Sequence, residues 1–240
     1  MKKPPFNLAN KPFVILSHPK TGAGTLLKYL NQSPNIQCYG QLFERDTIKL
    51  AEKKVNRLKV TLESRDEEPL VFLKQLFKLT PKVHAGFVFT FPLKKHLLLR
   101  RWLMNSELIN RVIVLRNPFD IYASRSAAGS IAQVPSLIKF DAEQFDKKIA
   151  TIIAGQNRLK KIAEKHPDST ITITHDEISM IASVQRVADF LGASPLPDAL
   201  KMSAEQVSSP RYSELFEDFS KVQSHVSAHH PDLVIDSDRI

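Results

Sequence analysis

One stretch near the amino terminus constrains the fold more than any other: residues 13–27, with the sequence FVILSHPKTGAGTLL. It begins with an unbroken apolar run, Phe13 to Leu16, which is typical of a buried β-strand. A loop with two glycines follows, and the apolar spacing of the next residues indicates a helix. In such a strand–loop–helix unit, backbone N–H groups and a helix N-terminus converge on one point, where they can bind an anion. The segment therefore predicts an α/β fold with a phosphate-binding loop.

The loop itself carries groups suited to a phosphate. Lys20 supplies a positive charge, and Thr21 and Thr25 supply hydroxyl groups. Because the lysine precedes Gly22 and Gly24, the nucleoside-triphosphate loop G-x-x-x-x-G-K-[ST] is not present. Glycines also occur in ordinary βα turns, so the loop alone leaves that alternative open.

A second segment, residues 111–125, has the features of another phosphate site. The apolar run VIVL is typical of a strand buried on both faces, and Arg116 follows it at the carboxyl end, where open α/β sheets bind ligands. Pro118 suits the first turn of the next helix, in which Ser124 would face back toward the strand end. A guanidinium and a hydroxyl together can clamp a phosphate. The alternative is a structural ion pair between Arg116 and Asp120.

These segments resemble motifs of the sulfotransferases that use 3′-phosphoadenosine-5′-phosphosulfate (PAPS). The order P-K-T-G resembles that family's 5′-phosphosulfate loop, P-[KR]-[ST]-G-[ST]-[ST], and RVIVLRNPFDIYASR resembles its 3′-phosphate segment. NIQCYGQLF (35–43) is similar to the C-x-G-E-x-F stretch of the bacterial nodulation and glycolipid branch, and ITITHDEIS (171–179) to a strand ending in Y-E-D-L. The four matches follow the family's order over about residues 12–192.

The resemblance implies a reaction and a set of roles. PAPS would donate a sulfuryl group to a hydroxyl of a carbohydrate, glycolipid or other small acceptor, and no metal would be required. Lys20 would be catalytic, because it can neutralise the charge that grows on the bridging oxygen as the bond breaks. The residues implied in donor binding are Lys20, Thr21, Gly22, Ala23, Gly24, Thr25, Arg116, Ser124 and, as a late contact, Arg211.

The chain departs from the family where a general base is expected. The branch it resembles has a Glu directly after the glycine of C-x-G-E, and here that residue is Gln41, which cannot accept a proton. Glu44 is our candidate for the catalytic base, although it would also suit the solvated start of a helix. His84 and His96 are further candidates. The alternative function is therefore a non-catalytic relative that binds PAPS or its product PAP but has lost its base.

Strand-like and helix-like patterns alternate along the chain. They predict a P-loop-like three-layer α/β fold, with a mainly parallel sheet of four or five strands and helices on both faces. Besides the two motif segments, we expect helices over 45–63, 70–79, 96–105, 141–165 and 179–191, and strands over 84–91 and 169–175. We expect residues 1–240 to form a single domain, in which 193–240 is a C-terminal extension that packs over the cleft or is partly loose.

Composition narrows the partners and the compartment. The net charge of +9 suits a polyanionic donor, but it would also suit nucleic acid or an anionic membrane. We find no nucleic-acid-binding signature and no apolar run long enough to span a membrane, so neither is expected. Cys38 is the only cysteine, which fits the cytoplasm. The histidines lack metal-ligand spacing, so no metal is expected. The acceptor and the oligomeric state stay open.

Overall fold

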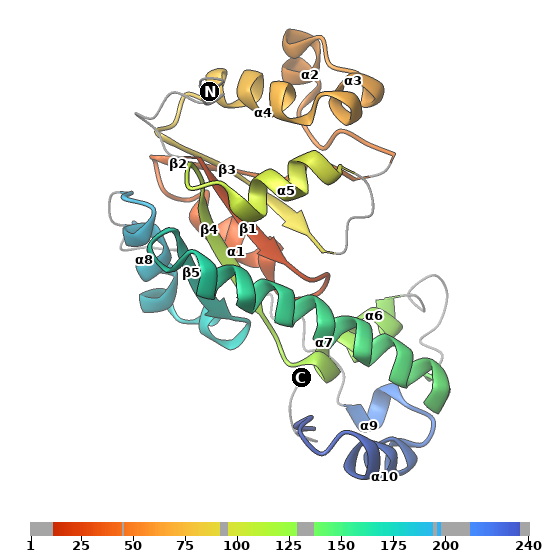
Figure 1. Ribbon diagram of the computed structural model, residues 1–240. Coiled ribbons are helices and arrows are strands. Elements are labelled where there is room, and N and C mark those ends of the chain that lie inside the picture. Colours follow the sequence, from red (N-terminus) through yellow and green to blue (C-terminus); the bar gives the residue numbers. More distant parts are fainter. Residues whose placement is uncertain are drawn as a thin grey trace.

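The computed structural model describes residues 12–44, 46–91, 96–128, 137–193, 196–197 and 212–235. Among these residues, five strands form one parallel sheet in the order β2-β3-β1-β4-β5 (Figure 1). The strands are β1 (Phe13–Ser17), β2 (Ile36–Gln41), β3 (His84–Thr90), β4 (Asn110–Leu115) and β5 (Thr170–Thr174). The predicted parallel α/β sheet is therefore confirmed.

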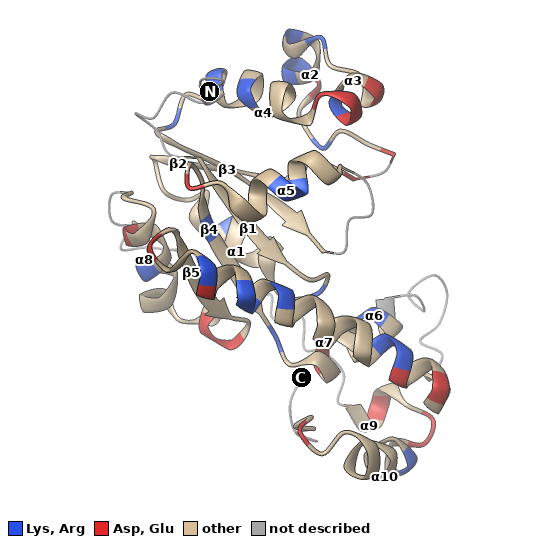
Figure 2. Ribbon diagram, in the orientation of Figure 1, with Lys and Arg blue, Asp and Glu red and all other residues tan. Residues whose placement is uncertain are grey.

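The apolar run at the start of the chain forms the central strand of the sheet. Ile15 pairs with Val88 of β3 on one side and with Val112 of β4 on the other. Every residue of β1 is buried, because neighbouring strands and helices cover it on all sides. Figure 2 shows that β1 and β3 carry no charged residue, whereas the helices around them do. This position explains why the run does not alternate between apolar and polar residues.

Helices cover both faces of the sheet. One face packs Phe13 and Ile15 against α1 and α8, and the other packs Val14 and Leu16 against α4, α5 and the second half of α7. The helices are α1 (Ala23–Leu30), α2 (Glu52–Leu58), α3 (Leu62–Glu67), α4 (Pro69–Lys78), α5 (Leu97–Asn105), α6 (Pro118–Ala128), α7 (Ala142–Lys165), α8 (Ile181–Phe190), α9 (Tyr212–Leu215) and α10 (Phe219–His229). The three predicted layers are present.

The prediction of one continuous helix over 45–63 is wrong. The chain instead forms two short helices, α2 and α3, and the first begins only at Glu52. Lys59 ends α2 in a left-handed conformation (φ 50°), and Thr61 then caps α3 through a reciprocal capping box with Ser64. The other helices and strands whose ranges we predicted begin and end within two residues of those ranges.

From Tyr212 onward, the described part of the tail packs against α6 and the first half of α7. Tyr212, Phe216 and Val222 share a buried cluster with Phe119 and Phe145 (Figure 1, α9 and α10 in blue). That the extension covers the cleft stays a prediction. In the part of the chain that the structure describes, no helix is long and apolar enough to cross a membrane.

Candidate functional site

The loop after β1 brings the N-terminus of α1 to the carboxyl edge of the sheet. Gly22 adopts a left-handed conformation (φ 90°), and α1 begins directly after it. The N–H groups of Thr25 and Leu26 donate to the carbonyl of Gly22. The N–H groups of Ala23 and Gly24 belong to the first turn, which has no intrahelical acceptors for them. They face the position where a phosphate would bind a helix N-terminus.

Two further loop residues have different surroundings. Thr21 is buried, and its hydroxyl donates to the carbonyl of His18 at 2.9 Å, so this hydroxyl stabilises the loop itself. Lys20 is exposed and has a left-handed backbone (φ 67°), which costs a non-glycine residue about 1–3 kcal/mol. Such a conformation persists only where the surroundings hold it, and here Arg116 donates to the Lys20 carbonyl.

Arg116 connects the end of β4 to this loop. Its Nη1 lies 2.9 Å from the carbonyl oxygen of Lys20, and its Nε lies 3.4 Å from Oδ2 of Asp120. The ion pair that the sequence left as an alternative is therefore present. Tyr212 donates to the other oxygen of Asp120, and Gln156 donates to the Arg116 carbonyl at 2.6 Å. The two segments predicted to bind phosphate thus meet directly.

Two cavities adjoin this contact. The larger, of about 400 Å³, lies in front of the loop and is bordered by the ends of β2 and β3 and by Lys49. Lys20 and Lys49 line it, and no described carboxylate does. The smaller, of about 160 Å³, is lined by Leu115, Arg116, Asn117, Asp120, Thr174, His175 and Asp176. Both lie at the edge of the sheet where parallel α/β folds bind ligands.

Similarity to known proteins agrees with this arrangement. No protein-family model matches the sequence, and no curated protein matches it. Among solved structures, mouse sulfotransferase SULT7A1 complexed with PAP aligns with 89% of this chain and 73% of its own, at 14% identity and a TM-score of 0.51. Sulfotransferase STF9 from Mycobacterium avium aligns with 97% of this chain and 79% of its own, at 11% identity and a TM-score of 0.54.

A third solved structure, the sulfotransferase domain from the curacin biosynthetic pathway, aligns with 88% of this chain and 84% of its own. Its identity is 11% and its TM-score 0.50. The chain has the sulfotransferase fold. The predicted relationship to PAPS-dependent sulfotransferases is therefore confirmed at the level of the fold, and the sulfotransferase-like loop and Arg116 lie at the same edge of its sheet.

Ser124 and Arg211 complete the donor residues that the resemblance implies. Ser124 is half-buried on α6, one turn beyond Asp120 and on the same helix face. It is not among the described residues that line the cavity of Arg116. Arg211 lies outside the described residues. Both roles stay predictions.

His175 was not a candidate in the sequence, yet it lies between the two phosphate segments. It follows β5 and lines the cavity of Arg116. A Cβ atom built on Gly22 would lie 2.9 Å from Cδ2 of His175, so the ring packs closely on the loop. Burial lowers the pKa of His175, and the charge of Arg116 lowers it further. The sequence signal was its place directly after β5, in the segment 171–179 that is similar to a strand ending in Y-E-D-L.

Gln41, which stands where a catalytic Glu was expected, has a hydrogen-bonded side-chain amide. The side chain of Gln41 lines the larger cavity and donates to the hydroxyl of Thr90 at 2.9 Å. Glu44 does not line this cavity in the described structure, and its carboxylate lies 2.7 Å from Nζ of Lys49, which does. Glu44 is therefore connected to the cavity only through its ion pair with a lining residue, Lys49.

No helix begins at Glu44, so the alternative that this residue lies at a helix start is wrong. The buried Arg65 donates to the carbonyl of Leu42 at 3.1 Å and to that of Thr47 at 2.7 Å. Of these two, the Thr47 carbonyl would accept a bond within the helix predicted over 45–63. Arg65 was not singled out in the sequence, although it anchors the segment that carries Glu44.

The two histidines considered as bases lie elsewhere. His84 begins β3, so it is at the amino edge of the sheet, opposite the loop, and burial lowers its pKa. His96 is the N-cap of α5, where its ring packs against Phe43 at 5.2 Å and lies 3.6 Å from Asp66. Neither is among the described residues that line the larger cavity.

The structure also brings together a possible ligand set that the sequence spacing did not reveal. Oδ1 of Asp146, on α7, lies 2.8 Å from Nε2 of His225 and 2.8 Å from Nε2 of His230. The three atoms that could bind a metal lie within 4.8 Å of one another. Both histidines lower the pKa of Asp146 through hydrogen bonds to its carboxylate. That the protein uses no metal stays a prediction.

Proposed function

We propose that the protein is a PAPS-dependent sulfotransferase that transfers a sulfuryl group to a hydroxyl of a carbohydrate, glycolipid or other small acceptor. The observation that carries this proposal is the bond from Arg116 to the Lys20 carbonyl. It joins a strand end suited to the 3′-phosphate to a loop suited to the 5′ end of the donor. A donor phosphorylated at both ends is what such a paired site would distinguish from ordinary adenine nucleotides.

The proposed donor roles follow the geometry. The N–H groups at the start of α1 would hold the 5′-phosphosulfate, together with Lys20. Arg116 would bind the 3′-phosphate, for which Ser124 and Arg211 are additional candidates. The Nη2 group of Arg116 has no hydrogen bond within the described residues, so it is available to a ligand. We propose no metal, because the charge of the donor would be balanced by these cations.

In the proposed reaction the acceptor oxygen attacks sulfur, while the bond from sulfur to the bridging oxygen breaks and PAP leaves. Catalysis would rest on in-line positioning and on the charge of Lys20 near the bridging oxygen. Glu44 is the proposed base for the acceptor proton. Its ion pair with Lys49 must open before it can reach the acceptor.

A second candidate function is a PAP-binding or PAPS-binding protein without turnover. It is favoured by one observation, that Gln41 and Thr90 bond to each other at the base position while Glu44 is paired with Lys49. This alternative keeps the donor site and differs only in the chemistry.

For either function we propose a single cytoplasmic domain over residues 1–240 that acts without nucleic acid. Its buried Cys38, whose pKa is raised by burial, would be an inert packing residue there.

The experiment is transfer of label from PAPS to a panel of hydroxyl acceptors, with Lys20→Met compared against wild type. If Lys20 acts mainly on the leaving group, its loss should reduce the rate far more than it reduces PAP affinity. Lys28→Met is the matched control, because Lys28 is an exposed lysine in the last turn of α1. Normal turnover of Lys20→Met at saturating PAPS would make the lysine a phosphate anchor only. If wild type binds PAP but transfers nothing, the second function holds.

A further inference from the structure

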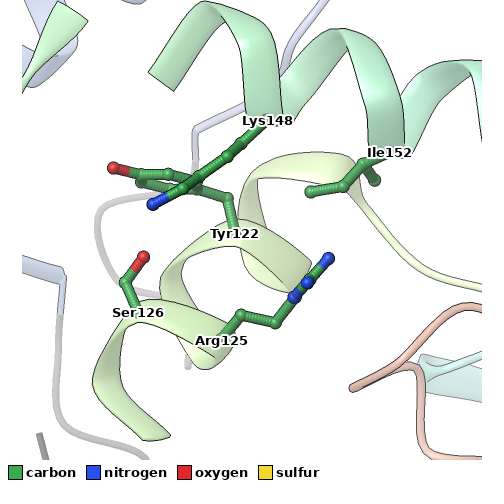
Figure 3. A pocket seen from close by; sticks show the side chains of 5 residues that line it. All are labelled: Tyr122, Arg125, Ser126, Lys148 and Ile152. Carbon is green, nitrogen blue, oxygen red and sulfur yellow. The ribbon is translucent and has the colours of Figure 1, made fainter. Parts of the chain in front are cut away.

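A separate cavity of about 180 Å³ lies between α6 and α7 (Figure 3). Its walls are Tyr122, Arg125 and Ser126 from α6, and Lys148 and Ile152 from α7. It shares no lining residue with either cavity described above. Figure 3 shows Lys148 reaching across the ring of Tyr122, with the Ser126 hydroxyl pointing toward it and the Arg125 guanidinium on the side of Ile152.

Both cations of this cavity lack a charged partner within the described residues. Neither Arg125 nor Lys148 forms an ion pair there, and Nζ of Lys148 lies 5.8 Å from the ring centroid of Tyr122. Burial raises the pKa of Tyr122, and the charge of the Asp141 carboxylate raises it further, so this acid acts on the cavity. Its carboxylate is engaged as the N-cap of α7, where it accepts from the N–H of Gln144 at 3.0 Å. Two cations and one carboxylate acting on the cavity leave it a net positive charge.

Neutral donors accompany the two charges. Burial raises the pKa of Tyr122, so its hydroxyl stays protonated at neutral pH, and the Ser126 hydroxyl lies on the same side of the cavity. Because Ser126 and Tyr122 hydrogen-bond to each other, a guanidinium, an ammonium and one hydroxyl form the donor set, which suits a carboxylate, phosphate or sulfate ester. Ile152 supplies an apolar wall, so the site would hold an acidic group attached to a larger molecule as well as a free ion.

The cavity lies beside the phosphate loop. The ring of His18, in that loop, packs on α7, since a Cβ atom built on Gly155 would lie 3.2 Å from Cδ2 of His18. Burial lowers the pKa of His18, and the charge of Arg125 lowers it further. Arg125 therefore acts electrostatically on the loop that also carries Lys20.

We infer that the cavity between α6 and α7 binds an acidic group of the acceptor. The substrate would then be a hydroxyl compound that already carries a carboxylate, phosphate or sulfate ester. The identification of the bound molecule as the acceptor rests on the proposed function. Anion binding by the cavity does not depend on that function.

The test is binding of inorganic phosphate, measured by thermal melting with and without PAP, against sodium chloride at equal ionic strength. The apparent dissociation constant should rise about tenfold or more in Arg125→Gln and in Lys148→Gln, because each removes a charge-assisted bond. Lys147→Gln is the matched control. It removes the same charge from the neighbouring position of α7, where Lys147 pairs with Glu143 at 2.5 Å outside the cavity. Unchanged phosphate binding in both cavity variants overturns the proposal.

A second measurement separates an acceptor group from a free ion. Matched acceptors that differ only in an acidic group, such as glucuronic acid and glucose, are compared in wild type and Arg125→Gln. The ratio of kcat/KM for the acidic over the neutral acceptor should fall about tenfold in the variant, and free phosphate should compete with the acidic acceptor. Phosphate inhibition that is not competitive would overturn the acceptor assignment. PAP binding is measured by calorimetry as an independent experiment. Failure of PAP to bind would refute the proposed function but not the anion site.

Discussion

Replacing Arg116 by Gln should distinguish a 3′-phosphate site from a structural contact. In the free protein this side chain uses Nη1 for the Lys20 carbonyl at 2.9 Å and Nε for Asp120 at 3.4 Å. If the proposal is right, the same guanidinium also binds the 3′-phosphate of PAP. AMP lacks that phosphate but would use the same loop. Comparison of the two nucleotides therefore separates the role of Arg116 in binding from its role in holding the loop.

The magnitudes differ enough to be resolved. Each bond from a charged donor to the 3′-phosphate contributes about 1.5–3 kcal/mol, so its loss should weaken PAP binding about 10–150-fold. Loss of the bond to Lys20 should loosen the loop at a cost of about 1 kcal/mol, which is about fivefold and applies to both nucleotides. The ratio of PAP affinity to AMP affinity should therefore fall about 10–150-fold.

Titration calorimetry with PAP and AMP measures this ratio directly. Asp120→Asn is the control, because it breaks the ion pair but retains the guanidinium of Arg116. It should leave the ratio close to that of wild type. Equal losses of affinity for the two nucleotides in Arg116→Gln would refute the 3′-phosphate assignment and leave Arg116 as a structural contact.

Three further outcomes test other parts of the structure. Gly86→Ala should lower the free energy of unfolding by about 1–3 kcal/mol, because the new Cβ would lie 2.5 Å from the buried ring of Phe13. Urea titrations measure this change, and a variant as stable as wild type would contradict the packing. Burial holds the pKa of His175 below 6.5 in the free protein, and a bound 3′-phosphate should raise this pKa. PAP binding would then take up a proton, so the affinity for PAP should rise as the pH falls from about 8 to about 6. His175→Gln should flatten that dependence relative to wild type. Glu44→Gln should reduce transfer about 10²–10⁴-fold with PAP binding unchanged, whereas activity that appears only in Gln41→Glu would show that the natural chain lacks a base.

Much of the scaffold could be predicted from local sequence. The apolar runs that precede Pro19 and Arg116 are too short for helices and do not alternate, which is typical of strands buried on both faces. Strong periodicity also located most helices. The segment after Gln41 could not be predicted in this way, because its backbone carbonyls are held by Arg65, whose place depends on how α3 packs.

The sequence by itself determined which segments bear the chemistry: a glycine loop with a lysine, and an arginine after a buried strand. Only the tertiary structure decided how they meet. Arg116 reaches Lys20 because β1 and β4 are neighbours in the sheet, although they are distant along the chain. His175 joins the same site because β5 lies next to β4. The cavity between α6 and α7 depends on the packing of two helices. Strand order and helix packing arise from burial of apolar surface over the whole chain, which no local pattern encodes.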